Sequence, residues 1–406
     1  MQIHPPQIRR AGTEVEWRVT VEGLPGPPAL WFRVDSRWTS LLTDLSDPAL
    51  AALLIPAMAA GTDTRVAGPL SERLWFQLSG CCQPLLQRLL RGLHPIRIDA
   101  RQLRDSGPRP AGVATGFTGG IDSWCVIADH HLAAAPQGFK LTHLVFNHVG
   151  SHGAGGERLF RERAQRLAPA AERIGLPLVL VASNLADFYD ERLSYLHTHA
   201  LRHAAVALLL QGGIGRYLSA STYPHDRAAL TPASGLTCDE PLLLPLLGSG
   251  RLELFSAGGA YTRVQKILRL ADIPETWQTL DVCIHADRAG NCSQCEKCLR
   301  TLATIEIAGL AQRYAAVFDL ARYRRRGRLR YFAIVRHSRN DFCTDIAALA
   351  RQRRFAWPWR ARLYGWLRWP LTRLEDAVEA LGIRRPLWLR ALRALRRRQP
   401  KCIFIR

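Results

Sequence analysis

The sequence contains no run of eighteen or more uncharged apolar residues, which is the length that a membrane-spanning helix requires. Its first residues, MQIHPPQIRRAGTEVEW, lack the apolar segment and the small-residue cleavage site of a signal peptide. Ten cysteines among 406 residues are too few for a disulfide framework, and four of them crowd between Cys283 and Cys298. We therefore expect a cytoplasmic protein in which the clustered cysteines bind a metal.

Most of the chain also lacks an excess of charge of one sign. Residues 321–406 hold 24 Lys and Arg against 5 Asp and Glu, a net charge of +19, which leaves only +2 of the chain's +21 for all the residues before them. The basic character that is typical of binding to nucleic acids or anionic membranes therefore belongs to the C-terminal tail. The body of the protein is electrostatically ordinary.

The length and the hydrophobic fraction of 48% predict a globular chain of two or three structural units. Two strand-like runs, 14–21 and 30–34, are separated by a Gly/Pro-rich turn and predict a small antiparallel unit. A helix is expected from about Asp47, with Pro48 in its first turn. The segment DSGPRP at 105–110 breaks regular structure. We expect an N-terminal α+β unit (1–108), a central domain (109–310) and a basic helical region (311–406).

From residue 112 onward, short apolar runs alternate with helical stretches. The strand-like runs cover 112–116, 141–146, 178–181 and 217–219. This alternation predicts parallel βαβ units, and hence an α/β fold with a Rossmann-like, doubly wound parallel sheet. Ligands of such sheets bind at the carboxyl ends of the strands, so we expect functional residues in the loops that follow the strands.

The segment TGGIDS at 118–123 lies between an apolar strand and a run compatible with a helix. Gly119 and Gly120 allow the backbone to approach a pyrophosphate, while the loop amides and the positive end of the helix supply donors. Thr118 and Ser123 add hydroxyl groups, and Asp122 is expected to fix the loop or to position Mg²⁺. The alternative is a purely structural Gly-Gly turn with an Asp cap. The strand-loop-helix context favours a site for ATP.

The cysteine cluster has the spacing C-x8-C-x2-C-x2-C, formed by Cys283, Cys292, Cys295 and Cys298. Thiolates two residues apart can chelate one tetrahedral zinc ion, and four thiolates close its coordination shell. With no open position, the zinc would be structural and would not activate water. An iron-sulfur cluster uses the same ligands and is the alternative.

Two of these features together resemble a known family. The stretch 118–123 resembles the Ser-Gly-Gly-x-Asp-Ser signature of the PP-loop ATP-pyrophosphatase superfamily, with Thr118 in place of the serine. The downstream cysteine spacing looks like that of the 7-cyano-7-deazaguanine synthase family of queuosine biosynthesis. The resemblance covers roughly 113–310 and implies a fold of the adenine nucleotide alpha hydrolase type. It also implies ATP contacts at Thr118, Gly119, Gly120, Asp122 and Ser123 and zinc ligands at the four cysteines.

A further basic position precedes the cysteines. Members of the family often have a basic residue after a Glu on a helix at this place, and here Gln265 occupies the place of the Glu and Lys266 follows it. We expect Lys266 to join Asp122 and Ser123 as a catalytic residue that contacts a phosphate or a substrate carboxylate. A solvated helical lysine is the alternative, and Arg263 lies on the same helix.

Several polar residues are candidates for substrate contacts because they follow predicted strands. After the second strand of the central domain these are His148, Ser151 and His152, in a loop that differs from that of the nitrile-forming enzyme. After the fourth strand they are Ser221, Tyr223, His225 and Asp226, for which a solvated loop is the alternative. The histidines His197, His199 and His203 invite a metal interpretation. Their spacing does not place all three on one helical face, so core or surface histidines are favoured.

The tail alternates arginine clusters with tryptophans. Two basic amphipathic helices are expected, over 371–381 and from Pro386 onward. They could bind RNA phosphates, an anionic membrane or an acidic partner, or pack on the body with solvated arginines.

These observations predict an ATP-dependent ligase-like enzyme, a C–N ligase of the PP-loop class with ATP, Mg²⁺ and Zn²⁺ as cofactors. The enzyme would adenylate a carboxylate or amide oxygen of a small molecule or a protein, release pyrophosphate and let a nitrogen nucleophile displace AMP. No general base can be identified from the sequence. The alternatives are a PP-loop RNA-modifying enzyme whose tail holds tRNA, and a non-catalytic nucleotide-binding partner protein.

Overall fold

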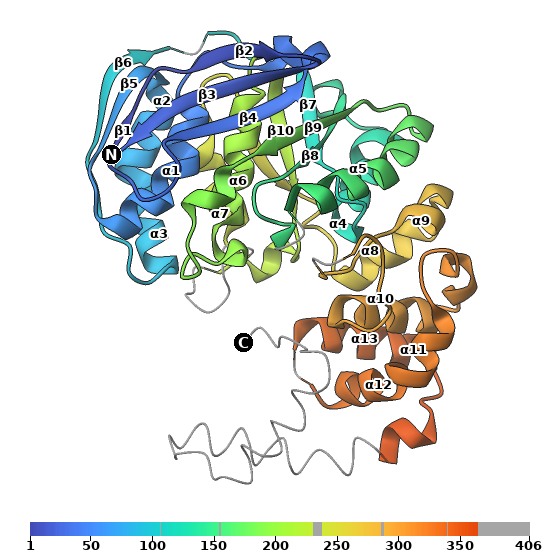
Figure 1. Ribbon diagram of the computed structural model, residues 1–406. Coiled ribbons are helices and arrows are strands. Elements are labelled where there is room, and N and C mark those ends of the chain that lie inside the picture. Colours follow the sequence, from blue (N-terminus) through green and yellow to red (C-terminus); the bar gives the residue numbers. More distant parts are fainter. Residues whose placement is uncertain (106, 154–155, 230–237, 286–287, 339, 364–406) are drawn as a thin grey trace, which may run out of the picture. The chain divides into compact units, whose positions relative to one another are not determined.

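A computed structural model describes residues 1–363 except 106, 154–155, 230–237, 286–287 and 339 (Figure 1). The chain divides into two compact units, of which the first comprises residues 1–261 and 286–289 and the second residues 262–285 and those from 290 onward. This division lies at neither of the predicted boundaries, 108 and 310. None of the helices in the described part of the chain is both long and apolar enough to cross a membrane.

The first unit is built on one eleven-stranded, mostly parallel sheet. The spatial order is β11-β10-β7-β8-β9-β4-β3-β1-β5-β6, with β2 paired to β3. The strands are β1 (Gln2–Ile3), β2 (Gln7–Ala11), β3 (Glu14–Glu22), β4 (Ala29–Asp35), β5 (Thr64–Ser71), β6 (Ile98–Arg104), β7 (Gly112–Gly116), β8 (His143–Asn147), β9 (Leu178–Ser183), β10 (Ile214–Ala220) and β11 (Glu253–Ala257). The predicted α/β class is therefore confirmed, with a large sheet that is mostly parallel.

Strands β7 to β11 form the parallel half of this sheet. Their spatial order is β9-β8-β7-β10-β11, so the chain moves outward from β7 to β9 and then returns to the other side of β7 for β10. All four pairings in this half are parallel. The order reverses between β7 and β10, and the crevice outside the carboxyl ends of the strands at such a point is where open α/β sheets bind ligands.

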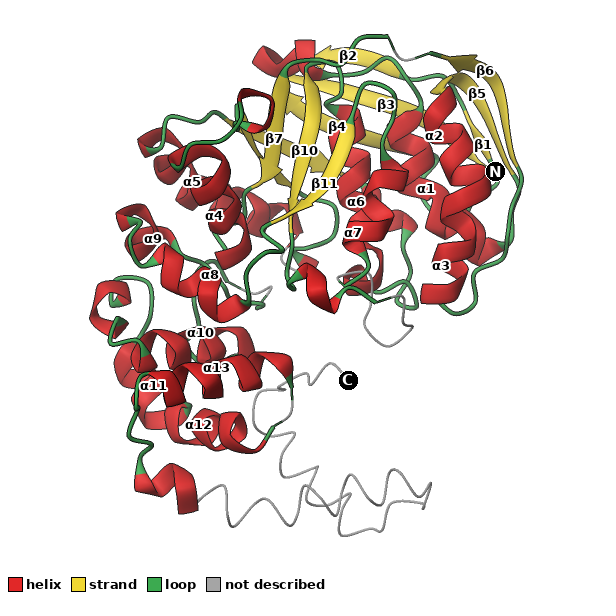
Figure 2. Ribbon diagram, turned by 180° about the vertical axis from the view of Figure 1, so that it is seen from behind, coloured by secondary structure: helices red, strands yellow, loops and turns green. Residues whose placement is uncertain are grey.

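Helices cover both faces of the parallel half. Figure 2 shows α4 and α5 on one face and α6 and α7 on the other. The helices of the first unit are α1 (Asp47–Ala60), α2 (Glu72–Phe76), α3 (Gln83–Leu89), α4 (Ile121–Ile127), α5 (Gly156–Arg173), α6 (Tyr195–Leu209) and α7 (Glu240–Leu243). Each crossover between successive parallel strands contains helix, as the alternating sequence pattern predicts.

The N-terminal segment does not form a sheet of its own. Strands β3 and β4 are antiparallel, as predicted, and the alternation of buried and exposed residues along β3 follows the period of two of a strand with one buried face. However, β4 also pairs with β9, with Phe32 opposite Ser183 and Arg33 opposite Ala182. The main-chain ladder thus joins the first hundred residues to the parallel half.

Helix α1 lies inside this combined structure. Its residues from Asp47 to Met58 are all buried, because the sequence DPALAALLIPAM has no polar face to present to solvent. Pro48 occupies the first turn, as predicted, where its missing N–H removes no helical hydrogen bond. The helix packs on α6, which is buried along most of its length.

One carboxylate is buried at the start of α1. Asp47 accepts hydrogen bonds from the Ser71 amide at 2.8 Å, from the Ser71 hydroxyl and from Gln211 Nε2 at 2.9 Å. Gln211 Oε1 in turn accepts from Ser249 Oγ at 2.6 Å. Burial raises the pKa of Asp47, while these donors oppose that shift. The network links α1 to β5 and to the segments that flank β10 and β11.

Asp47→Ala should therefore destabilise the protein. We expect the free energy of unfolding to fall by about 3 kcal/mol, because Ser71 and Gln211 would each lose a buried, charged acceptor. The shift of the urea midpoint measures this effect. Asp44→Ala is the matched control, since it removes an exposed carboxylate paired with Arg104 and should shift the midpoint little. Equal midpoints for the two variants would contradict a stabilising role for the network.

The second unit is helical in its described part. Its helices are α8 (Arg263–Leu270), α9 (Pro274–Thr279), α10 (Glu296–Ile307), α11 (Leu320–Arg326), α12 (Arg328–His337) and α13 (Asp341–Gln352). Helices α8, α10, α12 and α13 pack around the buried side chains of Leu302, Phe332 and Ile346. The cysteine cluster leads directly into α10.

Candidate functional site

The glycine loop connects β7 to α4. Its entry is held to the sheet by the Phe117 amide, which donates to Val145 O on β8 at 2.8 Å. Gly119 has a φ of +71°, a left-handed conformation that glycine adopts without the Cβ strain of other residues. The Gly120 amide donates to Thr118 Oγ1 at 3.4 Å, and Thr118 itself is exposed. The structure thus places the loop at the carboxyl end of β7, beside the point where the strand order reverses.

The following helix begins without a side-chain cap. Gly120 occupies the N-cap position of α4, and the amides of the first helical turn have no carbonyl within the helix to bind. Asp122 lies half-buried in that turn. Helix α4 continues without interruption into a π-helical turn over Ala128–Leu132. The loop therefore offers backbone donors and the positive end of a helix dipole.

Ser123 is more constrained than its sequence position suggests. Its side chain is buried, and its hydroxyl donates to Gly120 O at 3.0 Å. The hydroxyl thus ties the first turn of α4 to the glycine loop. A phosphate oxygen would have to replace Gly120 O as the acceptor of this proton.

The loop after β8 forms an aromatic cluster. His148 stacks on Phe160 with ring centroids 5.7 Å apart, and His148 Nδ1 lies 3.2 Å from His152 Nδ1. His152 is 1% exposed and packs edge-on against Phe146. Burial, with smaller contributions from His148 and Arg163, lowers the pKa of His152 to about 3. His152 is therefore a neutral core histidine, while Ser151 is exposed at the surface of the loop.

The loop after β10 is held against the edge of the sheet. Ser221 Oγ donates to Tyr223 O at 2.5 Å, and His225 Nε2 lies 3.0 Å from Ser256 Oγ on β11. The His225 ring also approaches Gly259 so closely that a Cβ there would lie 2.0 Å from it. Ser221 and His225 are thus held by a local and an edge-strand contact, while His225 and Asp226 are exposed.

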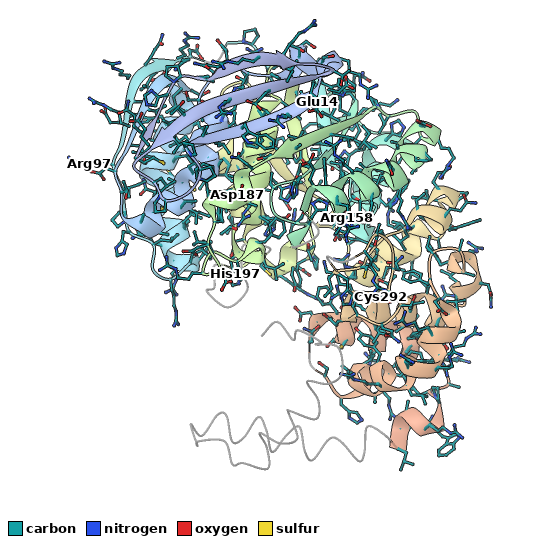
Figure 3. The ribbon with its side chains drawn as sticks, viewed as in Figure 1. Glu14, Arg97, Arg158, Asp187, His197 and Cys292 are labelled. Atoms are coloured by element: carbon teal, nitrogen blue, oxygen red, sulfur yellow. The ribbon has the colours of Figure 1, made fainter. Side chains whose placement is uncertain are left out.

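The histidines of α6 separate into two groups. His199 and His203 are one turn apart, and their ring centroids are 6.2 Å from each other. His197 is exposed (Figure 3). His203 Nε2 lies 2.7 Å from Tyr195 Oη, and its Nδ1 lies 3.2 Å from Asn147 Nδ2 at the end of β8. The three histidines therefore do not share one helical face, as their spacing predicts, and His199 and His203 belong to a polar cluster.

This polar cluster also contains residues that were not among the predicted site residues. His199 Nε2 lies 3.1 Å from Glu240 Oε1 at the start of α7, and Tyr195 is the third member of an i, i+4, i+8 series on α6. The Tyr–His–His spacing could have been found in the sequence. The participation of Asn147 and Glu240 could not, because only the tertiary fold brings them to α6.

In the second unit, the four predicted cysteines lie together. One ligand atom from each of Cys283, Cys292, Cys295 and Cys298 falls within 4.8 Å of every other. Cys295 is the N-cap residue of α10, Cys298 is in its first turn, and Cys292 and Cys298 have their Sγ atoms 3.9 Å apart. Figure 3 shows Cys292 close to the start of α10. The cluster could hold a metal ion, as predicted.

The backbone around the cluster suits thiolate ligands. The amides of Gln294 and Cys295 donate to Cys292 Sγ at 3.4 and 3.1 Å, which favours negative charge on that sulfur. Hydrogen bonding from the neighbouring thiols, Cys283 first, lowers the pKa of Cys292 and brings that of Cys295 to about 6. The turn between Cys292 and Cys295 includes Ser293 with a φ of +57°. Four soft, closely spaced donors with amide support fit a tetrahedral zinc ion.

Outer contacts hold the ligand loops in place. Asp281 accepts from the Cys283 and Gly290 amides, each at 3.1 Å. Asn291 accepts from the Val282 amide at 2.9 Å and donates to Leu280 O at 2.7 Å. The side chains of Asp281 and Asn291 thus join the segment before Cys283 to the segment that carries Cys292.

Lys266 lies in α8 of the second unit and is fully buried. The alternative of a solvated helical lysine is therefore wrong for this residue. Gln265 forms a capping box with Thr262, in which the Thr262 amide donates to Gln265 Oε1 at 2.8 Å. Gln265 thus serves to begin the helix. Arg263 is also buried.

Most of the basic tail, including the two amphipathic helices predicted over 371–381 and after Pro386, lies outside the described residues. Comparison of the chain with protein-family models, with curated proteins and with solved structures finds no match in any of the three.

Proposed function

We propose that the chain binds ATP at the loop Thr118–Ser123 and cleaves it between the α and β phosphates. The observation that carries the proposal is the position of the glycine loop. It follows the first strand of a parallel sheet ordered β9-β8-β7-β10-β11 and opens a helix beside the point where this order reverses. On this proposal the first unit is a PP-loop domain of the Rossmann-like type.

The residues of the loop favour pyrophosphate as the bound and departing group. Backbone amides, the uncapped start of α4 and the hydroxyls of Thr118 and Ser123 are neutral donors suited to several phosphate oxygens. Enzymes that transfer the terminal phosphate through a Walker loop place a lysine in it, and residues 118–123 contain none. Asp122 would help to position Mg²⁺, which would neutralise charge on the leaving pyrophosphate.

The reaction proposed is the activation of an oxygen by adenylation. A carboxylate or amide oxygen of the substrate attacks the α phosphorus, pyrophosphate leaves, and a nitrogen nucleophile then displaces AMP. The cysteine cluster would hold a structural zinc ion, because four thiolates leave no coordination position for water. Its closed shell would stabilise the helical unit that contains Lys266.

The products of ATP turnover test the proposal. We expect protein-dependent formation of labelled AMP and pyrophosphate when the full chain is incubated with α-labelled ATP, Mg²⁺ and extract from its own cells. The physical reason is that the loop stabilises charge on the departing pyrophosphate. Extract without added protein is the control for other enzymes that consume ATP. Protein-dependent ADP in place of AMP would overturn the proposal.

A further inference from the structure

Two consecutive buried carboxylates follow the loop after β10. Asp239 is 0% exposed and Glu240 is 4% exposed. Within the described part of the chain, both carboxylate oxygens of Asp239 and Oε2 of Glu240 have no hydrogen-bond partner. A buried acceptor without a donor costs free energy, and a buried carboxylate costs more than a neutral group. These three oxygen atoms therefore point to a missing donor.

The local structure supplies no hydrogen bond to these three carboxylate oxygens. Asp239 occupies the N-cap position of the short helix α7, yet its side chain makes no capping hydrogen bond. Burial raises the pKa of Asp239 to about 6, with no compensating donor. The buried guanidinium of α6, Arg202, directs its hydrogen bonds to Thr198 Oγ1, Val149 O and Leu193 O. This buried guanidinium is thus engaged with neutral oxygens.

His199 supplies a partner for only one of the four carboxylate oxygens. A carbonyl can only accept, so the 3.0 Å contact of His199 Nδ1 with Leu196 O places a proton on Nδ1. The 3.1 Å contact between His199 Nε2 and Glu240 Oε1 then needs one more proton between those two atoms. Glu240 Oε2 remains free to accept from another group.

The side chains around Glu240 reach the carboxyl end of β8. Its partner His199 lies one turn from both Tyr195 and His203, and His203 contacts Asn147 at the carboxyl end of β8. Burial, and secondarily the neighbouring Tyr195, raises the pKa of Tyr217. A Cβ on Gly116 would lie 3.2 Å from Tyr217 Oη, and Gly116 is the last residue of β7 before the glycine loop. Printed side-chain contacts thus run from Glu240 through His199 and His203 to the carboxyl end of β8.

We infer that Glu240 and Asp239 form a binding site for a primary ammonium group. Such a group offers N–H donors and a positive charge, which are what buried carboxylate oxygens without a partner lack. A divalent metal fits less well, because among the described residues only the four cysteines bring three or more His, Cys, Asp or Glu ligand atoms together. The role of the amine as the nucleophile of the ligase reaction rests on the proposed function, whereas its binding does not.

Ligand-dependent stabilisation tests the site without ATP. We expect methylammonium chloride to raise the melting temperature of the full chain saturably, by about 2 °C or more, relative to sodium chloride at equal ionic strength. Tetramethylammonium chloride, which has no N–H donor, should have no such effect. Glu240→Gln and Asp239→Asn should each abolish the rise, and Glu191→Gln, at an exposed position before α6, should retain it.

The outcomes separate this inference from the proposed function. Equal responses of the parent protein and of both carboxamide variants, or an equal response to tetramethylammonium, would overturn the site. Two variants are used so that a folding defect in one does not decide the result, and a cooperative melt in sodium chloride shows that each is folded. A selective amine response in a protein that yields no AMP would support the site and count against the ligase. AMP formation without any amine response would refute the site alone.

Discussion

Cys298→Ser is expected to remove the bound metal and to unfold the helical unit around it. The purified parent protein should carry about one zinc ion per chain, because four thiolates form a closed tetrahedral shell. Cys298 is fully buried in the first turn of α10, so serine would leave both an incomplete shell and a buried hydroxyl. Binding of structural zinc supplies on the order of 10 kcal/mol in small zinc domains, which exceeds what a few helices can replace.

Elemental analysis and circular dichroism measure this effect together. We expect the zinc content of Cys298→Ser to fall close to zero, with loss of helical signal and of soluble protein. Cys343→Ser is the matched control, since Cys343 is buried on α13 outside the cluster and its replacement should preserve the zinc. Iron with visible absorbance in the parent protein would show an iron-sulfur cluster instead. A well-folded parent protein without metal would refute the metal site.

Ser123→Ala is expected to slow AMP formation by about 100-fold, within the range found when one donor of a preorganised anion site is removed. The Ser123 hydroxyl lies in the first turn of α4 and donates a hydrogen bond to Gly120 O. Alanine would remove it both as a phosphate donor and as the link that holds the glycine loop. The fold should survive, because the change leaves the backbone and the core apolar contacts in place.

The rate of AMP formation and the melting temperature are compared for Ser123→Ala and for Ser40→Ala, an exposed serine of the same unit. The control should match the parent protein in both measurements. A rate for Ser123→Ala equal to that of the parent protein would show that the loop does not hold the leaving pyrophosphate. Loss of the melting transition would show that the hydroxyl is needed for folding, and Ser123→Thr, which keeps a hydroxyl, should then recover both folding and rate.

The local elements of the first unit could be predicted from the sequence because their signals are local. The predicted runs 112–116 and 178–181 lie within β7 and β9, and 217–219 lies within β10. The run 141–146 begins two residues before β8 and includes most of it. Hydrophobic runs, turn residues and helix starts depend on neighbours in the chain. Cysteines that are separated by two residues are also a local signal. The structure places all four cysteines of the cluster together, as this spacing predicts.

The extent of the sheet was decided by contacts between distant segments. The break in regular structure at 105–110 suggested that the first hundred residues form a separate unit, but the pairing of β4 with β9 extends one sheet across that break. An edge strand has unpaired amides and carbonyls wherever it occurs, and nothing local specifies which other edge satisfies them. The almost entirely apolar sequence of α1 indicates that this helix is buried, but it does not indicate that α1 packs against α6.

The features of the candidate site also divide into those set by local sequence and those set by contacts between distant segments. The sequence alone determined the glycine loop, its hydroxyls and the four cysteines, since each motif consists of neighbours whose spacing sets their geometry. Only the tertiary structure decided that Lys266 is buried and that His199 contacts Glu240. A side chain's charge, exposure and partners depend on what the fold packs against it. For His199 and Glu240 that partner comes from forty-one positions away along the chain.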